Sequence, residues 1–181
     1  MSTAIQNLET DHGYILSLIE VMEQITLTVD PNPEHLEMIV AVIREFADGL
    51  HHAKEENLLF PLMVKKGYSA EKGPVAVMLY EHQLGRNFVT GIAEGILQLR
   101  AGKREAIKEV YSNMLGYADL LKNHIAKENN VLFPMADKVF TETEKESLSA
   151  AFTEVEFDQP VGKKKVDYIS QIETLSAFYT A

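Results

Sequence analysis

The sequence predicts an all-α protein, an antiparallel up-and-down four-helix bundle with a C-terminal helical extension. Apolar residues recur in alternating steps of three and four along four long segments, as expected for amphipathic helices. Short connections that contain proline or glycine separate these segments. Helices joined by short connections pack most simply as antiparallel neighbours. We expect the bundle to occupy residues 1–140 and the extension to occupy residues 141–181.

The first two segments are predicted to form a helical hairpin. Pro31 and Pro33 separate them, because proline cannot continue the interior of a helix. The second helix is expected to begin near Glu34. The inward stripe of the first helix is Ile5, Leu8, His12, Ile15, Ile19 and Met22. The inward stripe of the second is Ile39, Ile43, Ala47, His51, Glu55 and Leu59.

The next two segments repeat this plan after a polar loop at residues 67–73, where Pro74 suits a first helical turn. Ala101 and Gly102 end the third helix. Pro61 and Pro134 are each expected to bend the last turns of a long helix. The third stripe is Met78, His82, Gly85, Val89, Ile92, Ile96 and Leu99. The fourth is Ile107, Val110, Met114, Tyr117, Leu121, His124, Glu128, Val131 and Met135.

The C-terminal region has a different pattern. We expect Thr143 to cap a short helix that reaches about Val155. The segment PVGKKK at 160–165 predicts a turn before a last amphipathic stretch, Val166 to Tyr179. Ile169, Ile172, Leu175 and Phe178 form the apolar stripe of that stretch. We expect the region to pack on the bundle or on the mate in a homodimer.

Composition excludes several classes of function. The net charge of −10 leaves no basic face for nucleic acid. The absence of cysteine excludes disulfides, thiolate metal sites and cysteine nucleophiles. The N-terminal residues do not resemble a signal peptide, and no apolar run is long enough to cross a membrane. The expectation is a soluble, cytoplasmic protein with neither a nucleic-acid nor a membrane partner.

An internal repeat contains the histidines and glutamates that suggest a function. HHAKEENLLFP (51–61) and HIAKENNVLFP (124–134) are identical at eight of eleven positions with an offset of 73. An acidic residue followed by an inward histidine occurs once in each preceding helix, as Asp11-His12 and as Glu81-His82. Two hairpins of the same plan would be related by an approximate two-fold axis through the bundle.

The repeat predicts a metal site inside the bundle. Residues four apart on a helix share a face, so His51 with Glu55 and His124 with Glu128 can each reach one metal. No inward lysine or arginine is evident to compensate the buried carboxylates, whereas metal cations would do so. Imidazole and carboxylate without thiolate favour iron, manganese, zinc or copper. The alternative, polar residues hydrogen-bonded only to one another, explains the repetition less well. The predicted ligands are His12, His51, Glu55, His82, His124 and Glu128.

Two neighbouring residues offer a second histidine and glutamate pair on the same helix. His52 and Glu56 have the same spacing as His51 and Glu55, but Ile125 and Asn129 replace them in the second copy. The repeat therefore favours His51 and Glu55. His52 stays open as a metal ligand, a hydrogen-bonding neighbour of the ligands, or a helix-interface residue. Arg86 is interpreted as a salt-bridge partner and Tyr117 as a core residue.

At these motifs the sequence resembles the hemerythrin-like, or HHE cation-binding, domain family. The resemblance covers about residues 3–140 and rests on Asp11-His12, the two repeated segments and GPVAVMLYEHQLGR (73–86). It implies a four-helix bundle around a non-haem di-iron centre, bridged by an oxygen atom or by carboxylates. Zinc or manganese are the substitutes to expect. Carried over residue by residue, the four histidines match terminal ligands, and Glu55 and Glu128 match bridging carboxylates.

The resemblance also has a departure. Oxygen-carrying members have a further histidine where this chain has Met78, and they use an aspartate as second bridge. The pattern is closer to bacterial members with two HxxxE segments, including proteins of iron–sulfur repair. The cysteine-bearing N-terminal segment of the repair proteins has no counterpart in this sequence.

Three functions follow as hypotheses. The first is binding or sensing of oxygen, nitric oxide or a related small ligand at the di-iron centre. The second is an enzyme that reduces peroxide or nitric oxide. The third is iron handling or iron–sulfur repair. The sequence leaves open whether the protein is an enzyme.

Overall fold

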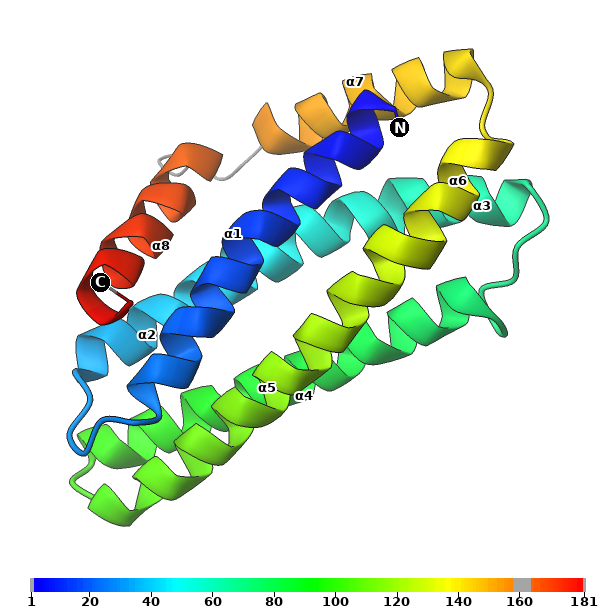
Figure 1. Cartoon of the computed structure of the whole chain (residues 1–181). Helices are drawn as coiled ribbons and strands as arrows, with labels where there is room; N and C mark the ends of the chain where they lie inside the picture. The colour runs from blue at the N-terminus through cyan, green and yellow to red at the C-terminus, as the bar shows by residue number, and fades with distance from the viewer. Residues whose placement is uncertain (1, 158–163, 181) are drawn as a thin grey trace.

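In the computed structural model the chain forms a bundle of four long helical rods, with two further helices along one side (Figure 1). The structure describes residues 2–157 and 164–180, and these residues contain no β-strand. The first rod is α1 (Thr3–Ile25). The second joins α2 (Pro33–Val42), η1 (Ile43–His52), η2 (Glu55–Leu59) and α3 (Phe60–Lys65). The third is α4 (Pro74–Arg100). The fourth joins η3 (Arg104–Ala106), α5 (Ile107–Lys127), η4 (Glu128–Leu132) and α6 (Phe133–Val139). The predicted four-helix bundle is confirmed.

The rods begin and end where local chemistry requires it. Asn32 caps α2, since its Oδ1 accepts a hydrogen bond from the Glu34 backbone N–H at 2.9 Å. Pro33 then takes the first helical position, one residue before the predicted start. Gly67 and Gly102 follow the ends of α3 and α4 with φ of 101° and 86°. Only glycine adopts this left-handed backbone without strain, so both helices stop there.

Three of the segments, η1, η2 and η4, are π-helical. The apolar pattern did not predict them. η2 and η4 end two residues before Pro61 and Pro134, which have no N–H to donate and whose rings crowd the preceding turn. In η1, a Cβ at Gly49 would lie 3.0 Å from the carbonyl oxygen of Arg44, so glycine fits the wide turn. Such wide turns occur often at functional sites.

The π-turn in η4 makes one part of the predicted inward stripe wrong. Val131 is 49% exposed and Met135 is only half-buried, whereas Leu132 and Phe133 are buried. A π-turn contains an extra residue, which moves the inward face one position along the chain. Leu132 is the repeat counterpart of Leu59, which is also buried.

The apolar core has two parts. One cluster includes Ile15, Phe46 and Met114 and fills the end of the bundle near the α1–α2 connection. The other includes Leu8, Met63 and Phe133 and fills the opposite end. Between them lies a layer that we call the polar layer. It contains every buried polar or charged side chain among the described residues: Asp11, His12, His51, His52, Lys54, Glu55, His82, His124 and Glu128.

Two C-terminal helices cover part of the bundle (Figure 1). Helix α7 (Glu142–Phe157) contacts α1 and η2. It is capped by Thr141 and not by the predicted Thr143: Glu144 N–H donates to the Thr141 hydroxyl, and Glu144 accepts from Thr141 N–H at 2.8 Å. Helix α8 (Lys165–Tyr179) lies along α1 and α2.

Helix α8 buries Tyr168, Ile172 and Leu175. Phe178 was predicted to lie on the buried stripe, but it is 68% exposed. Most of the turn predicted at 160–165 lies outside the described residues. The division into two domains and a contact with a second copy stay predictions. No helix among the described residues is long and apolar enough to cross a membrane.

Candidate metal centre

The polar layer brings together all six side chains that the sequence singled out. They come from all four rods, and none is more than 2% exposed. The six residues are His12 on α1, His51 at the end of η1, Glu55 in η2, His82 on α4, His124 on α5 and Glu128 in η4.

Each glutamate lies between an imidazole of the first hairpin and an imidazole of the second. Glu55 Oε1 is 3.5 Å from His51 Nε2, and Glu55 Oε2 is 3.5 Å from His82 Nε2. Glu128 Oε2 is 3.2 Å from His12 Nε2 and 3.3 Å from His124 Nε2. Both carboxylates are therefore placed where they can bridge two cations.

Two overlapping groups of side chains could each hold an ion, with ligand atoms within 4.8 Å of one another. The first group, near α1 and η1, is His12, His51, Glu55 and Glu128. The second group, near α4 and α5, is His52, Glu55, His82 and His124. Glu55 belongs to both groups, and Glu128 also reaches His124 in the second.

The protein atoms of the layer fit a cation. His12 Nε2 and all four carboxylate oxygens of Glu55 and Glu128 are buried without a hydrogen-bond partner. Buried polar atoms in folded proteins nearly always have a partner, so five together need an explanation. Burial raises the pKa of both carboxyl groups well above the usual range. A cation between the carboxylates would remove the cost of keeping their charges buried.

The imidazoles are ready to donate lone pairs. Burial lowers the pKa of His82 to about 4 and that of His124 to about 3, and it lowers the pKa of His12 and His51 as well. At neutral pH all four rings are therefore neutral. A neutral imidazole is the form that binds a metal.

Hydrogen bonds at the far side of each ring orient the histidines. His12 Nδ1 donates to Asn129 at 2.7 Å, and His82 Nδ1 donates to Glu56 at 2.7 Å. His124 Nδ1 donates to Glu81 at 2.9 Å. His51 Nδ1 lies 3.5 Å from Asp11 Oδ2. Each proton is held at Nδ1, which leaves Nε2 free to face the centre, as in metal sites generally.

These bonds give the acidic residue before each inward histidine a role that the sequence did not reveal. Asp11 does not orient its neighbour His12 but His51 on the next rod. Glu81 likewise orients His124 and not His82. The acidic–histidine pairs in the sequence were a signal of this arrangement. The partner could be known only once the rods were packed.

His52, whose role the sequence left open, lies in the second group. It is 5% exposed, its Nδ1 is 3.2 Å from Asp48 Oδ1, and its ring stacks on that of His82 at 3.7 Å between centroids. His51 and His52 both lie in η1, and adjacent side chains diverge less in the wider π-helical turn than in an α-helix. This geometry lets both face the polar layer.

Lys54 contradicts the expectation that no lysine points inward, because it is fully buried. Its Nζ bonds Asp11 at 2.6 Å, Asn7 at 2.6 Å and Glu156 at 2.9 Å. Its charge is therefore balanced by residues other than Glu55 and Glu128. Glu55 and Glu128 form no ion pair with a lysine or arginine in the described part of the chain.

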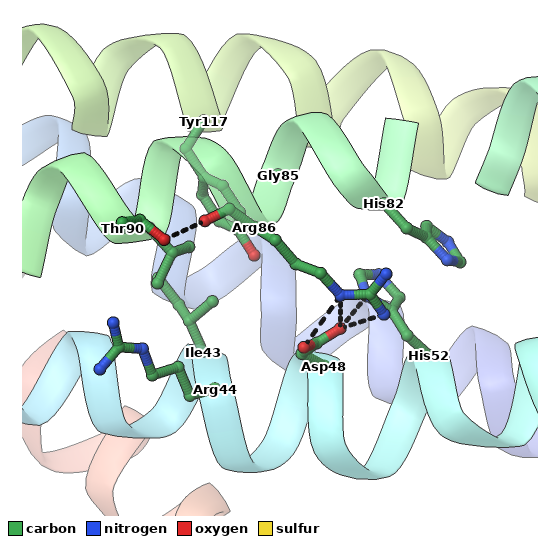
Figure 2. Close-up of a pocket in the computed structure, with 10 residues that line it drawn as sticks. Ile43, Arg44, Asp48, His52, His82, Gly85, Arg86, Thr90 and Tyr117 are labelled. Atoms are coloured by element: carbon green, nitrogen blue, oxygen red, sulfur yellow. Dashed lines mark hydrogen bonds and ion pairs between the residues drawn. The ribbon is translucent and has the colours of Figure 1, made fainter. Parts of the chain in front are cut away.

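Arg86 is a salt-bridge partner, as predicted. Its guanidinium lies 2.7 Å from Asp48, near His52 and His82 (Figure 2). It also lies 2.8 Å from Glu56. Because Asp48 contacts His52 and Glu56 contacts His82, Arg86 fixes two of the residues that orient the histidines. Tyr117 is buried, as expected for a core residue.

Comparison with known families agrees with this geometry. Residues 3–136 match the model of the hemerythrin HHE cation binding domain. The chain belongs to the hemerythrin family. The resemblance inferred from the repeated segments is thus confirmed, and the polar layer lies in the matched region.

This hemerythrin domain is also similar to curated bacterial proteins. Iron-sulfur cluster repair proteins YtfE from Salmonella schwarzengrund, Salmonella paratyphi B and Salmonella newport are each 38% identical to it over 90 residues. The matched region is 48% of this chain and 40% of each relative. The chain thus matches less than half the length of these relatives.

Proposed function

We propose that the polar layer holds two iron ions and that the protein binds or senses a small ligand such as oxygen, nitric oxide or peroxide. The observation that carries the proposal is a set of five buried, unpartnered atoms: His12 Nε2 and the four carboxylate oxygens that lie among the neutral imidazoles. Membership of a cation-binding family supports it. The names of the relatives support iron as the metal.

His12 and His51 would hold one ion, and His82 and His124 would hold the other. Glu55 and Glu128 would bridge them, because each lies between imidazoles of both hairpins. When bound, the iron pair would supply binding sites and electrons for the small ligand. The first group offers two imidazoles and two carboxylates, fewer donors than a six-coordinate ion accepts, so room is left for an external ligand.

The surrounding residues have supporting roles. Asn129, Asp11, Glu56 and Glu81 keep the proton of each imidazole on Nδ1 and so keep Nε2 directed inward. The two apolar clusters on either side keep water from reaching the layer along the bundle axis. Exclusion of water strengthens the electrostatic interactions between the ions and their ligands.

A second candidate is participation in iron–sulfur cluster repair. It is favoured by the similarity to iron-sulfur cluster repair proteins, which match this chain over 90 residues. Iron that moves readily to an acceptor would support it. Iron that resists a weak chelator would argue against it.

Metal analysis tests the proposal directly. Protein prepared without added metal and without oxygen should contain about two iron ions per chain, consistent with the two groups of ligands. Glu55→Gln and Glu128→Gln should each lower this content, while Glu142→Gln, at an exposed side chain, should not. One zinc ion, no metal, or full iron content in both variants would contradict the metal assignment. Stopped-flow mixing of reduced protein with oxygen and with nitric oxide should change the spectrum, and no change with either would contradict ligand binding.

A further inference from the structure

A cavity of about 120 Å³ lies between η1 and α4, next to the second group of metal-binding side chains (Figure 2). Its inner end is formed by the imidazoles of His52 and His82. Its outer end is formed by Arg44 and Thr90, both exposed. It therefore runs from the surface of the bundle to the polar layer.

The cavity has room for a small molecule only. A water molecule takes up about 30 Å³ in liquid water, so the cavity has room for only a few non-hydrogen atoms. Ile43, Gly85 and Val89, all buried, line its middle. An apolar lining of this kind favours a small, uncharged occupant.

The charges near the cavity do not favour an anion. The Arg86 guanidinium is engaged by Asp48 at 2.7 Å and by Glu56 at 2.8 Å, so no positive charge inside the cavity is left for an anion. Arg44 lies at the exposed end. An anion in the middle of the cavity would lose its hydration without compensation.

Tyr117 supplies the one uncharged polar group aimed from α5 toward this space (Figure 2). The residue is 2% exposed, and no hydrogen bond to its hydroxyl is found within 2–157 and 164–180. Burial raises its pKa, so the hydroxyl keeps its proton and can donate it. A hydroxyl that faces the cavity without a protein partner is available to a ligand.

Gly85 keeps the space open. A Cβ there would lie 3.5 Å from Tyr117 Cε2 and 3.8 Å from Leu121 Cδ2, which are ordinary contacts, so alanine would fit but would fill part of the cavity. Glycine inside a helix is otherwise unfavourable relative to alanine by about 0.5–1 kcal/mol. Packing alone thus does not require glycine at this position.

We propose that this cavity docks a neutral diatomic molecule, oxygen or nitric oxide, between its apolar walls and the Tyr117 hydroxyl, next to His52 and His82. The inference rests on the proposed function, because it names a docking site for the small ligand beside the same metal centre. The imidazoles of His52 and His82 separate the docked molecule from the bridging carboxylates.

Xenon binding tests the cavity without any metal. A crystal of metal-free protein under xenon pressure should show the gas between Ile43, Gly85 and Val89. Gly85→Ala should reduce its occupancy, and Val89→Phe should abolish it. Gly13→Ala is the matched control, since a Cβ at Gly13 in α1 meets nothing within 4 Å. Absence of xenon from the wild-type cavity would overturn the proposal whatever metal the protein binds.

Ligand kinetics on the iron-loaded protein test the role of the cavity. Gly85→Ala and Val89→Phe should slow association of the docked gas severalfold, and Gly13→Ala should not. Tyr117→Phe should speed its escape by no more than about twofold, because an uncoordinated diatomic gas accepts only a weak hydrogen bond. Oxygen and nitric oxide measured on the same variants distinguish the two ligands. Xenon in the cavity with unchanged rates for both gases would overturn the docking role, and lack of iron in the wild type would count against the proposed function instead.

Discussion

The two halves of the polar layer each combine an acidic residue, a histidine and a lysine, but in different surroundings. In the first half Asp11 contacts His51 and Lys54, and in the second Glu81 contacts His124 and Lys127. The two lysines are repeat counterparts. Yet the side chain of Lys54 is fully buried, whereas that of Lys127 is 42% exposed.

The C-terminal helices cause the difference. Glu156 of α7 lies 2.9 Å from Lys54 Nζ, and Lys165 of α8 lies 2.6 Å from Asp11 Oδ1 and 2.7 Å from Glu156. These residues close the first half into a network of two lysines and two carboxylates. No equivalent cover reaches Glu81 and Lys127 in the described chain. One sequence pattern therefore gives a sealed ion network in one half and a solvent-exposed ion pair in the other.

The largest expected effect comes from removing the two lysines in turn. Lys54→Met should destabilise the protein by about 3–5 kcal/mol, because it leaves Asp11 and Glu156 facing a single lysine in a buried place. Lys127→Met should cost no more than about 1 kcal/mol, as for other exposed ion pairs. Urea unfolding of both variants gives the comparison. Equal losses would mean that burial by the C-terminal helices does not separate the two halves.

Acid should affect both halves alike in the metal-free protein. The folded pKa of His82 is about 4, below its ordinary value of 6.5, and the pKa of His12 is also lowered, in both cases first by burial. Below pH 6.5 these histidines bind protons in the unfolded chain but not in the folded one, so their contribution to stability falls as pH falls toward 4. For His82 the total is of the order of 3 kcal/mol.

Melting temperatures measured between pH 7 and pH 4 check this. His12→Gln and His82→Gln should each lose less stability than the wild type as the pH falls, since each removes one buried imidazole that resists protonation. The raised pKa values of Glu55 and Glu128 act in the opposite direction in wild type and variants alike, so the test is the difference between each variant and the wild type. A variant that loses more stability than the wild type would contradict the sign, and a difference in one variant only would show that the halves differ in protonation as well as in exposure.

For metal affinity we expect the larger effect in the second half of the polar layer, the reverse of what we expect for stability. Glu81 lies 2.9 Å from His124, whereas Asp11 lies 3.5 Å from His51 and shares its charge with two lysines. Glu81→Gln should therefore weaken metal binding by about 10–100-fold, the usual cost of losing a carboxylate behind a ligating histidine. Asp11→Asn should weaken it less. Competition with a chelator measures both, and a larger loss in Asp11→Asn would break the comparison.

The smallest effect concerns the partners of His12 and His82. Asn129 and Glu56 are repeat counterparts, but only Glu56 brings a charge to its histidine. Asn129→Asp would give His12 a charged acceptor of the same shape as asparagine. Metal should then bind more tightly, within about tenfold. The same competition assay measures this, with wild-type protein as reference, and weaker binding would contradict the expected direction.

Most of the fold followed from periodicity. The stripes through His12, His51, His82 and His124 have helical spacing, and proline and glycine mark the breaks between them. The pattern went wrong at Val131, because a π-turn adds a residue that a 3.6-residue period does not include. It placed the cap of α7 at Thr143 because that residue, like Thr141, precedes acidic residues that suit a first turn.

The six predicted metal-binding residues, which the structure brings together in one buried layer, could be singled out because each repeats along the chain or lies on an apolar stripe. The places of His52 and Lys54 were harder to predict from the sequence. Neither has an equivalent in the second copy: the buried but apolar Ile125 replaces His52, and Lys127 is partly exposed. A repeat reveals what two copies share and says little about a residue on which they differ.

The sequence by itself determined the helices, their antiparallel plan and the set of histidines and glutamates on inward faces. These depend on local spacing, which each helix carries within its own residues. Only the tertiary structure decided which acidic residue orients which histidine and which lysine is buried. Those outcomes depend on contacts between distant segments, such as Asp11 with His51 and Lys54 with Glu156, that exist only after the rods and the C-terminal helices have packed.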